Sequence, residues 1–324
     1  MRRKEKILKR KGLAKPKKSV TKKENVEFTN KFILFYHDHY KKLLLIPFIM
    51  LFLALASILT MYVQTGDFLN KGISLSGGIT ITVLGEDINK DALLSALEEE
   101  YADHEIIIRL IQDGGVQRGV IVESTILPDD ERSDEFTDRV KELTGVSDDN
   151  FSVESIGASL GDAFFRQAGV AVLVAFLFMG IVVFAYFRTL IPSLAVILAA
   201  ASNIIVTVAI LNVAGFRIGT AGIAALLMLI GYSVDTDILL TTRLLKEKEG
   251  EVFTRLMGAM KTGLTMVLTT ILAALVTYFI AESDVLKEIL LIVILGLSVD
   301  LINTWLQNAG ILRWYIEKKG VPDE

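Results

Sequence analysis

The chain contains no cysteine and only three histidines among its 324 residues. Without cysteine it can form neither a disulfide nor a thiolate metal site, although this absence leaves the redox compartment undecided. His104 is the only histidine of a long polar segment, and no second type of metal ligand lies at a useful spacing from it. No G-x-x-x-x-G-K-[ST] loop is present, which argues against an ATP-driven role. The sequence therefore indicates no enzyme and no cofactor.

The chain is rich in long apolar segments. Hydrophobic residues make up 52% of the sequence, and its mean hydropathy is +0.50. A helix needs about 20 apolar residues to cross a bilayer. We expect six membrane helices, at Leu43–Val63, Ala168–Phe187, Leu190–Ala214, Gly219–Thr242, Thr262–Ile280 and Leu286–Gly310. The predicted fold is thus a polytopic α-helical membrane protein, with one span at 43–63 and a five-helix bundle at 168–310.

Basic residues indicate how these spans are oriented. Residues 1–40 form a strongly basic tail, and cytoplasmic segments of membrane proteins are enriched in Lys and Arg. Placing the tail inside also places Arg188, the loop 243–261 and the tail 311–324 inside, and leaves only Arg217 and Lys287 in the short outer loops. We therefore expect a multi-pass protein of the cytoplasmic membrane with both termini in the cytoplasm. The first span is too long for a cleaved signal and should remain as an anchor.

The basic tail has two further interpretations beyond orientation. Clusters of Lys and Arg beside a membrane attract anionic lipid and ribosomal RNA alike. Membrane lipid is thus an expected partner, whereas sequence-specific binding of nucleic acid is not. A partly disordered extension that only orients the chain explains the same charges.

A polar segment at 66–166 separates the first span from the others. Alternating residues predict strands at Ile79–Leu84, Glu105–Ile111, Gly119–Ser124 and Phe151–Ile156. Helical spacing predicts helices at Lys90–Tyr101 and Asp130–Leu143. The resulting order is βαββαβ, the ferredoxin-like split motif, on the outer face of the membrane. Its acidic residues are typical of solvated helix faces, so we expect it to contact a polypeptide or a subunit rather than perform chemistry.

Three aspartates lie within the apolar runs. An aspartate at a helix centre costs roughly 2.5–3.5 kcal/mol on insertion scales, and such residues usually serve ion pathways or proton relays. Asp235 lies eight residues before Arg243, about 12 Å along a helix, and is our first candidate for a titrating group. Asp237 points about 200° away from it, which suggests a pairing role, and Asp300 is a possible second relay member. Capping or charge pairing near the cytoplasmic end is the alternative.

Hydroxyl groups of the fifth run are candidate helpers for such a relay. Thr262, Thr265 and Thr269 share one helix face, with Thr270 beside it. Threonines of membrane helices also commonly bond to the carbonyls of their own helix, so a purely structural role explains them equally well.

Several short motifs resemble the SecF family, the smaller membrane subunits that work with SecD beside the Sec channel. The segment from Gly72 to Gly78 resembles the G-x-D-F-x-G-G element of that family, with Ser74 in place of the aspartate. Residues 155–161 are similar to S-V-G-P-x-x-G, with Ala158 in place of proline. Residues 231–243 resemble G-Y-S-x-x-D…R. The glycines of these motifs are candidate hinges, namely Gly72, Gly77, Gly78, Gly157, Gly161 and Gly231.

Departures from the bacterial pattern favour an archaeal-type SecF. Val234-Asp235-Thr236-Asp237 is closer to the V-D-A-N of SecD, and Ser202-Asn203 stands where bacterial relatives show His-Asp. Thr269-Thr270-Ile271-Leu272 is similar to the T-T-L-hydrophobic element of the family. The sequence LIGYSVD at 229–235 is similar to ILGLSVD at 294–300. In each segment a Gly and a Ser form a small-residue face for close helix packing next to an aspartate.

The resemblance implies an export role. It implies a SecD-like partner, the Sec protein-conducting channel and a translocating polypeptide, with proton motive force moving the external domain. Three other functions compete with it: a scaffold without titrating acids, a half-size lipid or drug exporter of the same superfamily, and an intramembrane aspartyl protease. The protease is disfavoured because the Gly-x-Gly-Asp signature is absent.

Overall fold

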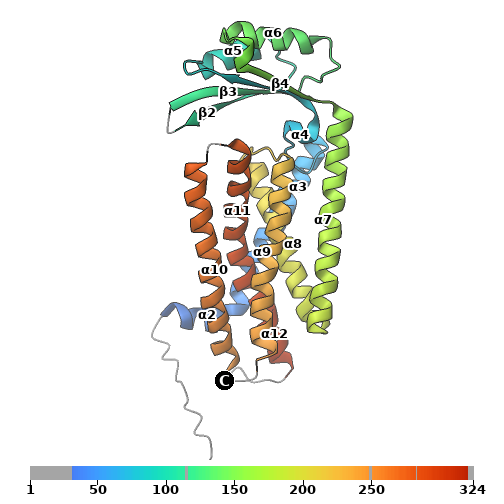
Figure 1. The fold of residues 1–324 in the computed structure, drawn as a ribbon. Helices are drawn as coiled ribbons and strands as arrows, with labels where there is room; N and C mark the ends of the chain where they lie inside the picture. The colour runs from blue at the N-terminus through green and yellow to red at the C-terminus, as the bar shows by residue number, and fades with distance from the viewer. Residues whose placement is uncertain (1–30, 114–115, 248–249, 282, 320–324) are drawn as a thin grey trace, which may run out of the picture. The chain divides into compact units, whose positions relative to one another are not determined.

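The computed structural model describes residues 31–113, 116–247, 250–281 and 283–319 (Figure 1). The chain divides into a unit of residues 1–38 and a unit of residues 39–324, with the boundary inside helix α2 (Lys31–Leu43). Most of the predicted basic tail lies outside the described residues.

Long helices make up most of the unit of residues 39–324 (Figure 1). They are α3 (Leu45–Thr65), α7 (Ala158–Phe187), α8 (Leu190–Val213), α9 (Thr220–Leu245), α10 (Val252–Ile280) and α11 (Asp284–Ile302), which continues through a π-helical segment, η2 (Asn303–Asn308), into α12 (Ala309–Lys318). Five described helical stretches are long and apolar enough to cross a membrane, at Phe35–Thr65 and at α7, α8, α9 and α10. Helix α11 differs because Lys287, Glu288 and Asp300 interrupt its apolar sequence.

Two helices begin about ten residues before the predicted spans. Helix α7 begins at Ala158 rather than Ala168, and α10 begins at Val252 rather than Thr262. Hydropathy marks only the part of a helix that is apolar, whereas backbone hydrogen bonding carries the helix through the polar residues that precede it.

A four-stranded antiparallel sheet lies between α3 and α7 in the sequence. Its strands are β1 (Gly78–Leu84), β2 (Ile106–Asp113), β3 (Val116–Ser124) and β4 (Phe151–Ile156), in the spatial order β2-β3-β1-β4. Helix α5 (Lys90–Glu100) joins β1 to β2, and α6 (Arg132–Thr144), followed by the short 3-10 turn η1 (Asp148–Asn150), joins β3 to β4. Every predicted strand and helix of this segment is present, with bounds shifted by three residues at most.

One face of the sheet carries the core of this region. Ile81 of β1 lies opposite Val122 of β3, and both are fully buried. Helices α5 and α6 cover this face (Figure 1) with Leu97 and Phe136, which are also fully buried. The alternation of apolar and polar residues along β1 therefore has its usual cause, since only one side of the strand is covered.

A short helix that the sequence did not predict, α4 (Ile73–Ser76), packs against the beginning of α7. Gly77, which follows α4, has a φ of 82°, and a Cβ there would lie 2.8 Å from the Cα of Ala158. A Cβ on Gly161 would lie 2.7 Å from the backbone nitrogen of Gly77. Both glycines are needed because the two backbones nearly touch, which fixes the chain where it enters and leaves the sheet.

This contact predicts that Gly161→Ala destabilises the protein. The added methyl group meets backbone on α4 and forces the two segments apart, at a cost of about 1–3 kcal/mol. Gly169→Ala is the matched control, because a Cβ on Gly169, in the same helix, meets nothing within 4 Å. In detergent, the apparent midpoint of thermal unfolding should fall by several degrees for Gly161→Ala only. Equal midpoints for the two variants would show that the close approach is not needed.

Candidate functional site

The bundle interior contains a group of polar side chains contributed by α8, α9 and the α11–η2–α12 run. We call this group the polar cluster. Every member is at most 3% exposed. Its members are Ser202, Asn203, Thr207, Ser233, Thr236, Asp237, Thr241, Asp300, Asn303, Thr304, Gln307 and Asn308.

Asp300 is the centre of this network. Its Oδ1 accepts hydrogen bonds from Asn203 Nδ2 at 3.3 Å, from Thr304 Oγ1 at 3.4 Å and from Ser233 Oγ. Its Oδ2 accepts one from Thr236 Oγ1 at 3.2 Å. Four donors from α8, α9 and η2 thus surround one carboxylate, an arrangement that stabilises its ionised form.

Asp237 is the second buried carboxylate and is close enough to Asp300 to interact with it electrostatically. Its Oδ1 accepts a hydrogen bond from Asn308 Nδ2 at 2.7 Å, whereas its Oδ2 is buried without a partner among the described residues. Nearby, Gln307 Nε2 donates to Ser202 Oγ at 3.0 Å. The two carboxylates therefore share one low-dielectric interior but differ in how completely they are hydrogen-bonded.

Close packing of α9 and α11 brings these groups together. A Cβ on Gly296 of α11 would lie 2.1 Å from Cδ2 of Leu229 on α9, so a larger residue at 296 would displace the buried Leu229 side chain. Just beyond Asp300 the helix takes the wider π form over Asn303–Asn308, and four of these six residues are polar and buried. Single π turns inside helices often mark functional positions.

Asp235 and Asp237 lie on different faces of α9. The side chain of Asp235 is exposed, whereas Asp237 is fully buried. The sequence gives the depth of a residue in an apolar run but not the side of the helix that packs inward. On α9 the inward face includes Ser233, Thr236 and Leu240, so the 3.6-residue period places Asp237 inside and Asp235 outside.

The other predicted site residues lie elsewhere. Thr269 Oγ1 bonds to the carbonyl of Thr265, and Thr270 Oγ1 bonds to that of Met266. Both hydroxyls are thus bonded to their own helix, and the structure does not bring them to the aspartates. Gly231 lies on the exposed face of α9 with nothing near its Cα that a Cβ would meet.

Sequence reasoning missed most partners of the two buried acids. Asn303, Thr304, Gln307 and Asn308 stand close together in the last apolar run, and this local density of polar residues is the signal that could have revealed them. The pair Ser202-Asn203 was noticed only as a departure from a bacterial pattern. Its role becomes visible once Asn203 is seen to bond to Asp300.

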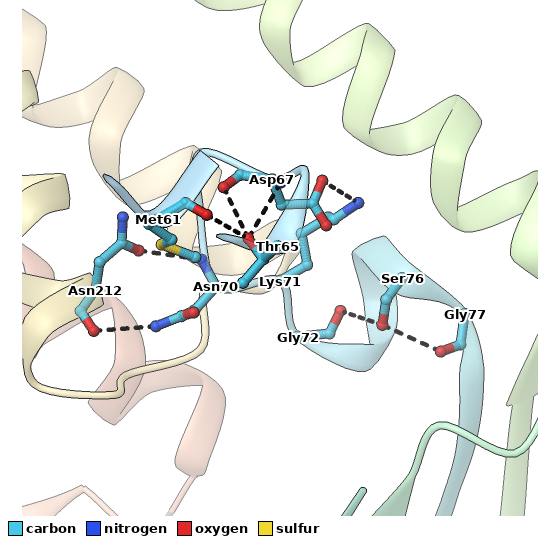
Figure 2. Close-up of polar contacts among 9 residues, drawn as sticks. All are labelled: Met61, Thr65, Asp67, Asn70, Lys71, Gly72, Ser76, Gly77 and Asn212. Atoms are coloured by element: carbon cyan, nitrogen blue, oxygen red, sulfur yellow. Dashed lines mark hydrogen bonds and ion pairs between the residues drawn. The ribbon is translucent and has the colours of Figure 1, made fainter. Parts of the chain in front are cut away.

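A second polar region joins the sheet to the bundle (Figure 2). Asn70 donates two hydrogen bonds to Asn212, from its N to Asn212 Oδ1 at 3.0 Å and from its Nδ2 to Asn212 O at 3.1 Å. Ile218 N donates to Asn70 O at 2.8 Å, and Gly72 N donates to Ile218 O at 2.9 Å. The segment that leads into the sheet is thereby fixed to the loop between α8 and α9. We call this region the joint.

Two side chains cap the N-terminus of α9 at the joint. Ser74 of α4 accepts a hydrogen bond from Thr220 N at 3.0 Å, and Glu288 of α11 accepts one from Gly219 N at 2.8 Å. The free N–H groups and the dipole of a helix N-terminus favour negative charge there. Position 74 carries no aspartate, and the carboxylate at this helix end comes from Glu288 on α11.

An ion pair adds a third link at the joint. Arg217, in the loop between α8 and α9, pairs with Glu105, which directly precedes β2. Partial burial lowers the pKa of the Arg217 guanidinium, but an arginine stays charged at any physiological pH. The ion pair therefore links the start of β2 to the loop that precedes α9.

Comparison with known proteins identifies the family of this chain. Residues 136–318 match the family described as protein export membrane protein SecD/SecF, C-terminal. Over 86% of its length the chain is 37% identical to the "Protein-export membrane protein SecF" of Methanolacinia petrolearia, covering 95% of that protein. It is 41% identical to that of Methanocaldococcus jannaschii, over 76% of this chain and 87% of the other. These relatives agree with the resemblance to an archaeal-type SecF.

A solved structure supports the fold. The crystal structure of SecDF, a translocon-associated membrane protein from Thermus thermophilus, matches 96% of this chain with a TM-score of 0.66 and 20% identity. The chain covers 41% of that longer protein. A SecDF structure in a "Super-membrane-facing form" matches 85% of the chain with a TM-score of 0.57.

The capped helix end predicts a test at Glu288. Glu288→Gln removes the charge from the N-terminus of α9 and should weaken that end by about 1–2 kcal/mol. Amide hydrogen exchange over 215–224 should then become faster, with little change in the remainder of α11. Lys287→Gln, one residue away, is the control and should leave exchange unchanged.

A second substitution tests whether position 74 and Glu288 serve one cap. Ser74→Asp places a carboxylate on Thr220 N, and it should restore slow exchange in the Glu288→Gln background. In the wild-type background it should not stabilise the same amides, because two carboxylates would then share one helix end. Unchanged exchange in Glu288→Gln would mean that this cap contributes nothing.

Proposed function

The chain belongs to the SecD/SecF family of protein-export membrane proteins, and on that premise we propose that it assists the translocation of polypeptides across the cytoplasmic membrane together with a SecD-like subunit. The observation that carries the proposal is the pair of buried carboxylates, Asp237 and Asp300, inside one polar cluster. Such groups are costly inside a membrane and are typical of proton or ion pathways. A protein that served only as a scaffold would have no use for them.

Proton exchange at Asp237 is the step we infer. Asp300 accepts hydrogen bonds from four donors, which favour its ionised form. Asp237 accepts one hydrogen bond at Oδ1, and its Oδ2 has no hydrogen-bond partner among the described residues. That free oxygen is the position at which a proton can bind without breaking an existing bond. Each elementary charge that crosses 100 mV is worth about 2.3 kcal/mol, enough to change the packing of two helices that share a charge site.

Helices α9 and α11 connect the polar cluster to the joint. Glu288 and Asp300 lie on the same helix, twelve residues apart, which is about 18 Å. Helix α9 carries Asp237, and its N-terminus is capped by Glu288 and Ser74. A change in the distance between α9 and α11 would therefore reach α4 and the sheet, and cyclic movement of the sheet would hold or pull an emerging polypeptide.

An exposed stripe on α9 supports the partnership. Ala224, Met228, Gly231, Tyr232 and Asp235 are exposed at spacings that place them on one face. A carboxylate facing lipid is expensive, so this stripe is the face we assign to the SecD-like subunit. Contact with the Sec channel is part of the same proposal and follows from the family alone.

The finer architecture is proposed on the same basis. We assign α11–η2–α12 as a sixth span, because it runs as one helical stretch beside α9 and α10. The βαββαβ order with the strand sequence β2-β3-β1-β4 supports a ferredoxin-like external domain. The segments are then a basic tail (1–40), a first span (43–63), an external domain (66–166), the bundle (168–310) and a cytoplasmic tail (311–324), with both termini in the cytoplasm.

The relay predicts different effects for the three aspartates. Both Asp237→Asn and Asp300→Asn keep size and hydrogen-bonding capacity. Because the first removes the titrating group and the second removes the neighbouring charge, export should lose its response to the proton gradient in both. Asp235→Asn, on the outer face of the same helix, should retain that response. The measurement is export of a secretory protein by membrane vesicles with and without an uncoupler, at equal amounts of each variant. If Asp237→Asn stays fully responsive, the scaffold function replaces the relay.

The partner face predicts a site-specific cross-link. Because the chain has no native cysteine, Met228→Cys introduces a single thiol on the stripe, and it should cross-link to cysteines placed on a co-expressed SecD-like chain. Leu59→Cys on α3 is the control, since Leu59 is 62% exposed but lies on a helix that packs against α8. Cross-linking at Leu59 but not at Met228 would contradict the assigned face.

A further inference from the structure

A cavity of about 450 Å³ lies where α7, α9 and α12 end and α8 and α10 begin. These helix ends lie at the end of the bundle opposite to the sheet (Figure 1). The lining of the cavity comes from the turn between α7 and α8, from the last residues of α9, from the first turn of α10 and from the end of α12. The lining residues are Phe187, Thr189, Leu244, Leu245, Lys246, Glu247, Arg255, Tyr315, Ile316 and Lys319.

The cavity has an excess of positive charge. Lys246, Arg255 and Lys319 contribute three cations, and Glu247 contributes the single acid. Glu247 is already neutralised, because its carboxylate lies 3.4 Å from Nε of Arg243. The two lysine amines lie over aromatic rings, Lys246 at 3.4 Å from the ring of Tyr186 and Lys319 at 4.7 Å from that of Tyr315. Among the residues the structure describes, no carboxylate forms an ion pair with these three cations.

Two lining residues also have buried donors without partners. Arg255 uses Nη1 to bond the carbonyls of Leu244 and Glu247 at the end of α9, while its Nε is buried with no partner in the described part of the chain. The hydroxyl of Thr189 is likewise buried and has no hydrogen-bond partner among the described residues. Buried polar groups are normally hydrogen-bonded, so both donors are available to an anion that enters the cavity.

Backbone strain at the turn supports a functional role. Arg188 has a φ of 53° and is the only residue other than glycine with a positive φ among the described ones. It lies between Phe187 and Thr189, which both line the cavity. Non-glycine residues rarely adopt this conformation, and they do so preferentially at functional sites. The strained turn holds these two neighbours in the cavity wall.

We propose that this cavity binds the phosphate group of an anionic phospholipid. Phosphate matches the three cations and the free donors, because basic pockets between membrane helices recognise such head groups. Leu245 and Ile316 supply an apolar wall for the glycerol end of the acyl chains. Tyr186, whose ring lies under the lining residue Lys246, is 47% exposed, as aromatic residues are at the level of lipid head groups. The bound lipid ties the ends of α7, α9, α10 and α12 together.

The test uses the purified chain in a neutral detergent, titrated with short-chain phosphatidylglycerol, with phosphatidylcholine and with inorganic phosphate. The double variant Lys246→Gln/Lys319→Gln removes two cations of the cavity. The control Lys261→Gln/Lys318→Gln makes the same change in net charge at exposed lysines that do not line it. Arg255 is left intact because it bonds the end of α9.

The readouts are the midpoint of thermal unfolding and the lipid retained in native mass spectra. Phosphatidylglycerol should raise the midpoint of the wild type and of the control, and its apparent affinity should fall at least tenfold in the Lys246→Gln/Lys319→Gln variant. Phosphatidylcholine should have no comparable effect. Equal affinity in the two double variants, or an equal response to phosphatidylcholine, would overturn the site. If inorganic phosphate reproduces the full shift, the ligand is free phosphate and the lipid assignment is wrong.

Discussion

The bundle depends on keeping two carboxylates, Asp237 and Asp300, out of water between α9 and α11. Burial of ionisable groups is tolerated only when donors and close packing compensate for lost hydration. The donors come from α8, α9 and the π segment, and Gly296 permits the close approach of the two helices. Substitution of a single donor would leave a buried charge poorly compensated, so the polar cluster constrains the sequence of three helices at once.

Local patterns in the sequence were sufficient to predict most of the helices and strands. Hydropathy predicted the five described helices that are long and apolar enough to cross a membrane, and alternation predicted all four strands, because these signals depend only on neighbouring residues. The sequence favoured Asp235 over Asp237, whereas the structure buries Asp237 and leaves Asp235 exposed. Two residues at the same depth point to opposite sides of α9, and only tertiary packing decides which side is interior. The π segment and the short helix α4 were missed for a related reason. Both are stabilised by contacts with segments distant in the sequence.

Position 74 illustrates how a departure from a family pattern can be explained. The sequence showed only that Ser74 replaces an aspartate. In the structure, Ser74 faces the N-terminus of α9, and Glu288 supplies a carboxylate to that same helix end from α11. Because Glu288 and Asp300 share a helix, this arrangement also connects the joint directly to the buried acids. Ser74 therefore contributes a neutral hydroxyl to this helix end, and Glu288 contributes the negative charge.

The central claim is that Asp237 exchanges a proton within the membrane while Asp300 stays ionised. Infrared difference spectroscopy of the purified protein across a pH series observes carboxyl groups directly, through their C=O stretching band. The account predicts one titrating band from a buried carboxyl group, lost in Asp237→Asn, unchanged in Asp235→Asn and shifted in Asp300→Asn because the neighbouring charge is removed. A titrating buried band that persists unchanged in Asp237→Asn would contradict it.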